Sequence, residues 1–194
     1  MTQTPAYRKV ILASRLMLAS VWIAALSSIP SAQRFKEQLD AGVAPKDITT
    51  WFATLLLLVT LASIFAWFAV VNWMRERYDE SQRQSPGAMR LSRTWITWSW
   101  LLPIVSLWYP KRMIDDLLGA SAADADSSPT DKSTDTRLWW ATWITYTIMS
   151  NLTTLQLAML PTNSVPFQPN VEIAAACILT ASYTVWGNIV RKIG

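Results

Sequence analysis

The side chains that could carry out acid–base or metal chemistry are few in this sequence. There is no histidine, which removes the commonest general base, the commonest metal ligand and the usual axial ligand of haem. The single cysteine, Cys177, excludes an internal disulfide and a thiolate metal site. We therefore expect a protein that is not an enzyme and that binds neither a cofactor nor a metal ion.

One charge cluster stands out, next to a proline-containing segment. Lys111 and Arg112 are followed by Asp115 and Asp116. One of the two carboxylates could act as a base on a lipid substrate, which would make the chain a membrane enzyme. The same spacing fits a solvated face of a surface helix, or a docking site for a partner on the cytoplasmic side. The absence of histidine and of a metal cluster argues against the enzyme.

Two ionisable residues lie within apolar segments, where such residues are by default candidates for ion or proton handling. Arg15 lies about two turns inside the first apolar segment, so its side chain can extend back to the lipid headgroups. Glu172 opens the last apolar segment, and a carboxylate is favoured at the N-terminus of a helix. Because both positions have these simpler explanations, we assign neither residue a role in transport.

The composition indicates a bilayer as the solvent of these segments. Of the 194 residues, 52% are hydrophobic and only 15% are charged, whereas a soluble domain has about 25% charged residues. Twelve tryptophans favour the membrane–water boundary. The formal charge is +4, but the basic residues lie at the edges of apolar blocks, so we expect no nucleic-acid partner. The sequence predicts an all-α integral membrane protein.

Five apolar blocks are candidates for membrane segments, because a helix needs roughly 20 mostly apolar residues to cross. Four blocks are predicted to cross, at about 7–29, 51–73, 138–160 and 171–190. The first is expected to stop at Pro30, and its length favours a retained helix over a cleaved signal peptide. The remaining block, 95–109, is shorter and is interrupted by Pro103.

The distribution of basic residues decides whether the block 95–109 crosses. If it does not cross, fourteen of the seventeen Lys and Arg residues lie on the side of the two chain ends. If all five blocks cross, the two sides carry nearly equal numbers. Because basic residues near span ends stay cytoplasmic, we predict four spans with both termini cytoplasmic. The block 95–109 then forms a Pro-broken re-entrant or interfacial hairpin, which must pack against the four helices.

Two cytoplasmic segments are expected after the hairpin. Residues 111–118 predict a short amphipathic helix at the membrane surface, with charged residues on one side. Its apolar side would consist of Met113, Ile114, Leu117 and Leu118. Residues 119–136 are rich in Ala, Ser, Asp and Thr, and this low hydrophobicity predicts a flexible cytoplasmic loop.

The region around this hairpin carries a family resemblance. The motif is Trp100-x-x-Pro103-x-x-x-Leu107-Trp108-x-Pro110, followed by Asp116-Leu117, Ala120-Ser121 and Leu138-Trp139-Trp140. It resembles a family of actinobacterial four-span membrane proteins that is classed as a domain of unknown function. The layout is similar from about Leu55 to Val190. The resemblance implies two helices, a basic loop, the Trp/Pro motif and two further helices in a bacterial plasma membrane, and it implies no activity.

The sequence departs from the family's pattern at two places. The family usually has Asn before its Leu-Trp pair, where this chain has Ser106. It usually has Trp-Arg in the later segment, where this chain has Leu118 and Gly119. Any binding role of those polar residues in the family therefore does not carry over to this chain.

These observations predict a non-catalytic accessory subunit, or an assembly or stability factor, of a larger complex in the bacterial plasma membrane. Its partners would be other integral membrane subunits and membrane lipids, and a respiratory cytochrome–oxidase supercomplex is our specific expectation. The alternative is a small channel or transporter that acts as an oligomer. The partner contact is expected at Trp100, Pro103, Trp108, Tyr109, Pro110, Asp115 and Asp116.

Overall fold

The computed structural model of the chain is all-helical in the part that it describes, as the sequence predicts. The described residues are 5–43, 46–87, 89–102, 105–122, 129–159 and 168–193. Their elements are α1 (Pro5–Asp40), α2 (Lys46–Gln84), α3 (Trp95–Leu101), the 3-10 turn η1 (Val105–Leu107), α4 (Tyr109–Ala122), α5 (Pro129–Met159) and α6 (Pro169–Ile193).

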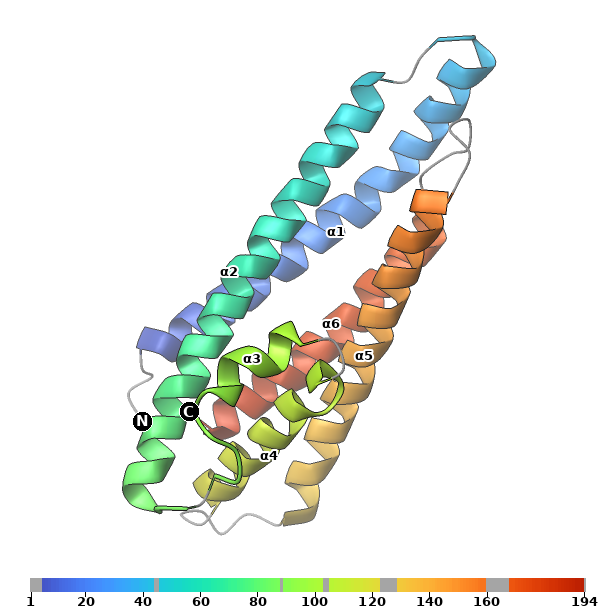
Figure 1. Cartoon of the computed structure of the whole chain (residues 1–194). Helices are drawn as coiled ribbons and strands as arrows, with labels where there is room; N and C mark the ends of the chain where they lie inside the picture. Colours follow the sequence, from blue (N-terminus) through green and yellow to red (C-terminus); the bar gives the residue numbers. More distant parts are fainter. Residues whose placement is uncertain are drawn as a thin grey trace.

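Four long helices lie roughly side by side in the order α2, α1, α6, α5 (Figure 1). The short elements α3, η1 and α4 cover the lower half of this row, between α2 and α5. α1 packs along α2, α5 packs along α6, and α1 packs along α6, but α2 and α5 make no extended contact within the described residues. The row of four helices is therefore not closed into a bundle.

Three helices are long and apolar enough to cross a membrane: α1, the part Thr50–Gln84 of α2, and α6. They suggest a membrane protein, in agreement with the composition. α5 has 31 described residues and is also long enough. It is not among the three, because threonines and tryptophans make its sequence less apolar.

The prediction that the first helix stops at Pro30 is wrong, because α1 continues through Pro30 to Asp40. Proline removes one backbone donor from the helix and so frees a carbonyl one turn earlier. Serine hydroxyls can compensate for such a break in an apolar environment. Ser28 Oγ donates to the carbonyl of Ala25 (2.7 Å) and Ser31 Oγ donates to the carbonyl of Ser27 (2.6 Å), on either side of the affected turn.

The predicted loop 119–136 is largely helical, which corrects its bounds. α4 extends to Ala122 and α5 already begins at Pro129, so only 123–128 lie outside the described residues. Proline is favoured in the first turn of a helix because it needs no donor there. Thr136 is fully buried, and Asp135 accepts a hydrogen bond from Lys192 Nζ at the end of α6 (2.8 Å). These tertiary contacts stabilise a polar segment that has little helix signal of its own.

The main core lies at the end of the molecule that contains α4. Buried residues from all the long helices meet there, and Met113, Ile114, Leu117 and Leu118 of α4 are nearly inaccessible, so the predicted apolar side is confirmed. α4 packs against α2, α5 and α6. It therefore joins the two halves of the row.

The opposite half of the row has a thinner core, built from small residues. Ala25 of α1 and Ala176 of α6 are buried against each other's helices, which lets the two backbones approach closely. Trp22 Nε1 donates to Thr180 Oγ1 across the same seam (3.0 Å). In this half the seam between α1 and α6 connects the pair α1–α2 to the pair α5–α6.

Candidate functional site

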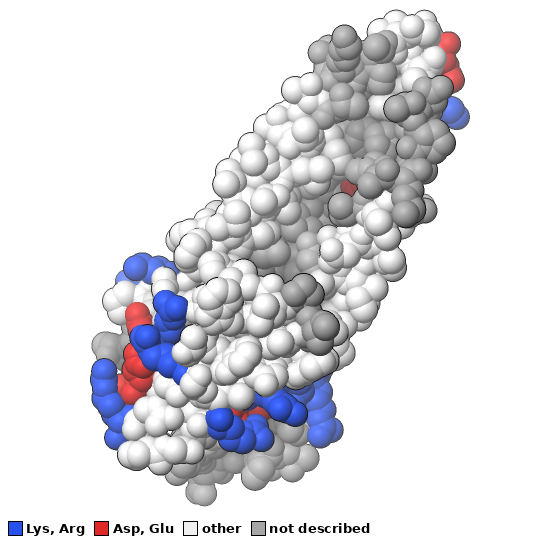
Figure 2. All heavy atoms as spheres, in the orientation of Figure 1, with Lys and Arg blue, Asp and Glu red and all other residues white. Residues whose placement is uncertain are grey.

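Charged side chains gather at one end of the molecule, on the face that Figure 2 shows, and an uncharged belt separates them from the other end. This end is formed by the start of α1, the end of α2, α4, the start of α5 and the end of α6 (Figure 1). Arg and Lys predominate, but carboxylates lie among them. The polarity along the long axis is the one expected of a protein that sits across a bilayer with one basic side.

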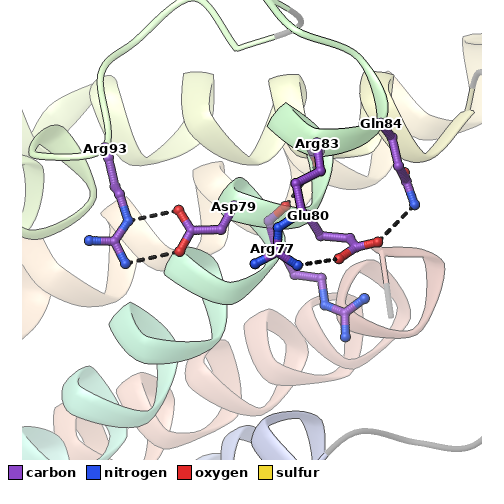
Figure 3. A network of polar contacts seen from close by, with 7 residues as sticks. Arg77, Asp79, Glu80, Arg83, Gln84 and Arg93 are labelled. Carbon is purple, nitrogen blue, oxygen red and sulfur yellow. Dashed lines mark hydrogen bonds and ion pairs between the residues drawn. The ribbon is translucent and has the colours of Figure 1, made fainter.

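An ion-pair network ties the end of α2 to the segment before α3 (Figure 3). Arg93 Nε and Nη2 donate to the two carboxylate oxygens of Asp79 at 2.8 and 3.0 Å, a bidentate geometry. These hydrogen bonds, and then the attraction of the carboxylate, raise the pKa of Arg93. Glu80 accepts from Gln84 (3.0 Å) and from Arg83 (3.4 Å) on the same helix.

A second ion pair ties the same segment to α4. Arg90 Nε and Nη2 approach Asp116 Oδ1 at 2.7 and 2.5 Å, and the backbone N–H of Arg90 donates to Oδ2 at 3.2 Å. The Asp116 side chain is only 5% exposed, so the prediction that it lies on the solvated side of the helix is wrong. A carboxylate so deeply buried needs a cation and hydrogen-bond donors, and Arg90 supplies both. No local sequence pattern indicates this partner, which lies 26 positions away.

The predicted contact residues have different surroundings in the structure. Asp115 is half-buried and is paired with Lys111 Nζ at 2.5 Å, one helical turn away. Pro110 is buried, and Tyr109 packs against Trp95 with ring centroids 4.9 Å apart. Pro103 lies outside the described residues. Asp115, Asp116 and Pro110 therefore hold α4 in place rather than forming an open contact surface.

An exposed apolar surface does occur at the turn between α3 and α4. We call it the turn surface, and it consists of Trp98, Leu101, Leu102, Leu107 and Trp108. Each of these side chains is at least 40% exposed. The turn is attached to α5 through Trp140, whose Nε1 donates to the carbonyl of Leu107 at 3.0 Å. Of the predicted contact residues that the structure describes, Trp108 alone belongs to this surface.

Six tryptophans form a continuous aromatic ladder through the protein. Its steps are Trp73–Trp186, Trp186–Trp139, Trp139–Trp140, Trp140–Trp143 and Trp143–Trp100, with ring centroids 5.0 to 5.8 Å apart. The ladder connects α2, α6, α5 and α3. Trp73, Trp139 and Trp186 are at most 4% exposed, so these rings pack inside the protein rather than at a lipid boundary. On α5, Trp143 lies three residues after Trp140 and four after Trp139. This helical spacing is the one local sequence pattern that could have indicated the ladder.

A cavity of about 260 Å³ opens beside this ladder. It is lined by Met17, Ser63, Ala66, Trp67, Val70, Trp100, Trp139, Trp143, Ser182, Tyr183 and Trp186. These residues come from α1, α2, α3, α5 and α6. Trp100, the central predicted contact residue, belongs to this cavity and packs edge-on against Trp143 rather than facing outward.

A second cavity, of about 320 Å³, lies at the charged end. Lys9, Asn72, Arg75, Glu76, Asp79 and Arg93 line it, together with Ala6 and Ala69. Its charges largely balance, and Arg75 Nη2 donates to Thr97 Oγ1 at 2.6 Å. Within the described part of the chain, no group of three or more Cys, Asp or Glu residues is placed to hold a metal ion.

The sequence pattern that defines one family matches residues 37–186, from the end of α1 through most of α6. The chain belongs to this family, which is described as a domain of unknown function (DUF4328). The match confirms the resemblance to a family of unknown function. No curated protein and no solved structure is significantly similar to the chain.

Proposed function

We propose that this protein is a non-catalytic accessory subunit, or an assembly factor, of a larger complex in the bacterial plasma membrane. In this proposal α1, α2, α5 and α6 all cross the bilayer, and the charged end with both termini is cytoplasmic. α3 and η1 enter the membrane from that side and return without crossing. The specific partner that we propose within this class is a respiratory cytochrome–oxidase supercomplex.

Two observations support α5 as the fourth span. α5 packs along α6 over its length, and α6 is one of the three strongly apolar helices. Arg137 and Asp135 lie at the charged end, and the more apolar part of α5 begins after them. An α5 that crosses beside α6 leaves both chain ends on the basic side, which satisfies the positive-inside rule.

The single observation that carries the accessory function is the turn surface. Two tryptophans and three leucines lie exposed on a short element that is itself held rigidly by Trp140 and by the ion pairs of Arg90 and Arg93. Rigid, exposed aromatic side chains are the residues that dominate binding at protein interfaces. No cluster of reacting groups accompanies them in the described residues, so the protein's effect is expected to come through contact.

The test is mild extraction of the tagged full-length chain from its native membrane, with quantification of the integral membrane proteins that co-purify. Truncation of an anchoring tryptophan costs about 2 kcal/mol, so Trp108→Ala should weaken the affinity for the partner by about thirtyfold and so deplete it from the purified material. Trp51→Ala is the matched control, because Trp51 is also exposed but lies on α2 far from the turn. Retention of the partner by Trp108→Ala and by Trp98→Ala would contradict the proposed surface.

The open row of helices favours one alternative, a channel or transporter formed by several copies. Because α2 and α5 make no extended contact, the row presents an open side that a second copy could close. Purification of the wild-type chain as a homo-oligomer without other proteins would favour this alternative over the accessory subunit.

A further inference from the structure

The cavity beside the aromatic ladder is about 260 Å³ in volume and is partly open to its surroundings. α2 contributes Ser63, Ala66, Trp67 and Val70 to one wall, and α5 contributes Trp139 and Trp143 to the other. Since these two helices make no extended contact within the described residues, and α3 adds only Trp100 to the lining, we infer an opening in the wall between them. In a membrane, this opening would face the hydrocarbon chains of the surrounding lipid.

The size of the cavity restricts what can occupy it. An apolar cavity of about 150 Å³ is already large enough for a benzene molecule. A helix of a partner protein is about 10–12 Å across with its side chains, which is too wide for this space. The volume therefore fits part of one hydrocarbon chain, and the rest of that chain can extend along the open side between α2 and α5.

The lining offers water few hydrogen bonds. Ser63 Oγ already donates to the carbonyl of Val59 (2.7 Å), and the Tyr183 hydroxyl donates to Met17 Sδ (2.7 Å). The rest of the lining is aromatic or aliphatic apart from Ser182, so most of the cavity surface suits an apolar guest. The aromatic rings of the ladder present wide apolar faces to such a guest.

Two donors in the lining nevertheless have no acceptor. The indole N–H groups of Trp67 and Trp100 are buried and make no hydrogen bond. An unsatisfied buried donor costs about 1–3 kcal/mol. Because both rings border the cavity, a guest with a carbonyl group at one end of its hydrocarbon chain could supply the missing acceptor.

We propose that this cavity binds one acyl chain of a membrane phospholipid, which enters between α2 and α5. The ester carbonyl of that chain lies near Trp67 and Trp100 and accepts a hydrogen bond from an indole N–H. The chain continues along the open side of the row, over α1 and α6. This binding does not depend on the accessory function, because it uses the cavity and not the turn surface.

The experiment uses the full-length chain in lipid nanodiscs that contain a phospholipid with a diazirine on one acyl chain, close to the ester. After irradiation, peptide mapping by mass spectrometry identifies the labelled residues. We expect label on the cavity residues Trp143 and Tyr183, in addition to label on exposed residues such as Leu57. Label confined to exposed residues would overturn the proposal, since lipid would then contact only the outer surface.

Filling the cavity supplies the decisive comparison. Ser63→Phe places a ring in the cavity and should reduce label on Trp143 and Tyr183 by about tenfold. Thr60→Phe is the matched control, because Thr60 lies one turn away, makes the same hydroxyl-to-carbonyl bond and is exposed. It should leave the cavity label unchanged, and label on Leu57 should be equal in all three proteins.

A second variant and a second measurement distinguish a filled cavity from misfolding of Ser63→Phe. Val70→Phe fills the same cavity from another position, and thermal unfolding of each purified variant shows whether the fold is retained. Native mass spectrometry of the wild-type protein should find one retained phospholipid that Ser63→Phe and Val70→Phe both lack. A retained molecule of another class, such as a free fatty acid or a prenyl compound, would overturn the phospholipid assignment.

Discussion

Arg90 and Asp116, on two different segments, form an ion pair with one deeply buried partner: the carboxylate is 5% exposed, whereas the arginine side chain is 69% exposed. Three donors of Arg90 converge on this one carboxylate, at 2.5, 2.7 and 3.2 Å. Hydrogen bonding to Asp116, followed by its charge, raises the pKa of Arg90, so the arginine stays cationic at any physiological pH. The pair fixes α4 to the segment that precedes α3.

Asp116→Asn should therefore lower the thermal stability of the detergent-solubilised protein. It removes the charge from a group that accepts three hydrogen bonds, and we expect a loss of about 1–3 kcal/mol in the free energy of unfolding. Asp115→Asn is the control, because Asp115 is 30% exposed and its pair with Lys111 lies within one helix. A pair at this spacing on one helix is worth about 0.3–0.5 kcal/mol. Equal melting temperatures for the two variants would contradict the assigned role of Asp116.

Because the aromatic ladder is buried, we expect the substitution of Trp186 to destabilise the protein much more than the substitution of Trp51. Trp186 is 3% exposed and contacts both Trp73 and Trp139, whereas Trp51 is 54% exposed. Trp186→Ala should destabilise the protein by about 3–5 kcal/mol. Trp51→Ala should change the stability by no more than about 0.5 kcal/mol. Chemical denaturation in detergent, followed by circular dichroism, measures both; similar losses would show that the ladder adds nothing beyond surface burial.

Loss of the hydrogen bond between Trp140 and Leu107 is expected to loosen the turn around η1 without unfolding the whole protein. Trp140→Phe keeps an aromatic ring beside Trp143 but removes the N–H that the Leu107 carbonyl accepts. The loss of one hydrogen bond corresponds to about 1 kcal/mol, so amide exchange around η1 should accelerate about fivefold. Hydrogen–deuterium exchange with mass spectrometry reports this directly. Faster exchange throughout α5 as well would indicate that Trp140 supports the helix and not the turn.

The topology can be tested with single cysteines in a Cys177→Ala background and an impermeant thiol reagent. Ala41→Cys, in the turn after α1, should be labelled in intact cells. Ser85→Cys and Ser127→Cys, which flank α3 and α4 in the sequence, should be labelled only after the cells are opened. Labelling of Ser127→Cys but not of Ser85→Cys in intact cells would mean that the chain crosses between them, and the re-entrant segment would then be wrong.

The long helices were predictable because their apolar stretches are nearly continuous, and hydropathy is a local property of the sequence. The apolar side of α4 was predictable from the spacing of its apolar residues, and the end of α3 at Leu101 from the proline that follows two residues later. Pro30 and the start of α5 were not, since their helical state depends on serine hydroxyls within the helix and on contacts such as Lys192–Asp135. In both cases, contacts with other residues stabilise a helix at a position where the local helix propensity is low.

The candidate site was less predictable than the fold. Trp108 is exposed on the turn surface, whereas Trp100 faces the cavity and Asp116 is buried. Whether a tryptophan lies at a lipid boundary or inside the protein depends on which helix packs beside it. Trp186 and Trp139 meet only because α5 and α6 are neighbours, and a single sequence without an alignment does not contain that information.

The arrangement of α2, α1, α6 and α5 in an open row has a mechanical consequence. The helix pairs α1–α2 and α5–α6 contact each other along the interface of α1 with α6. Near one end of the molecule, α4 packs against both pairs. A small rotation of one helix pair about α4 produces a larger displacement at the far end of that pair, because both pairs extend well beyond α4. A displacement at the turn between α3 and α4 would therefore be amplified at the opposite end of the molecule.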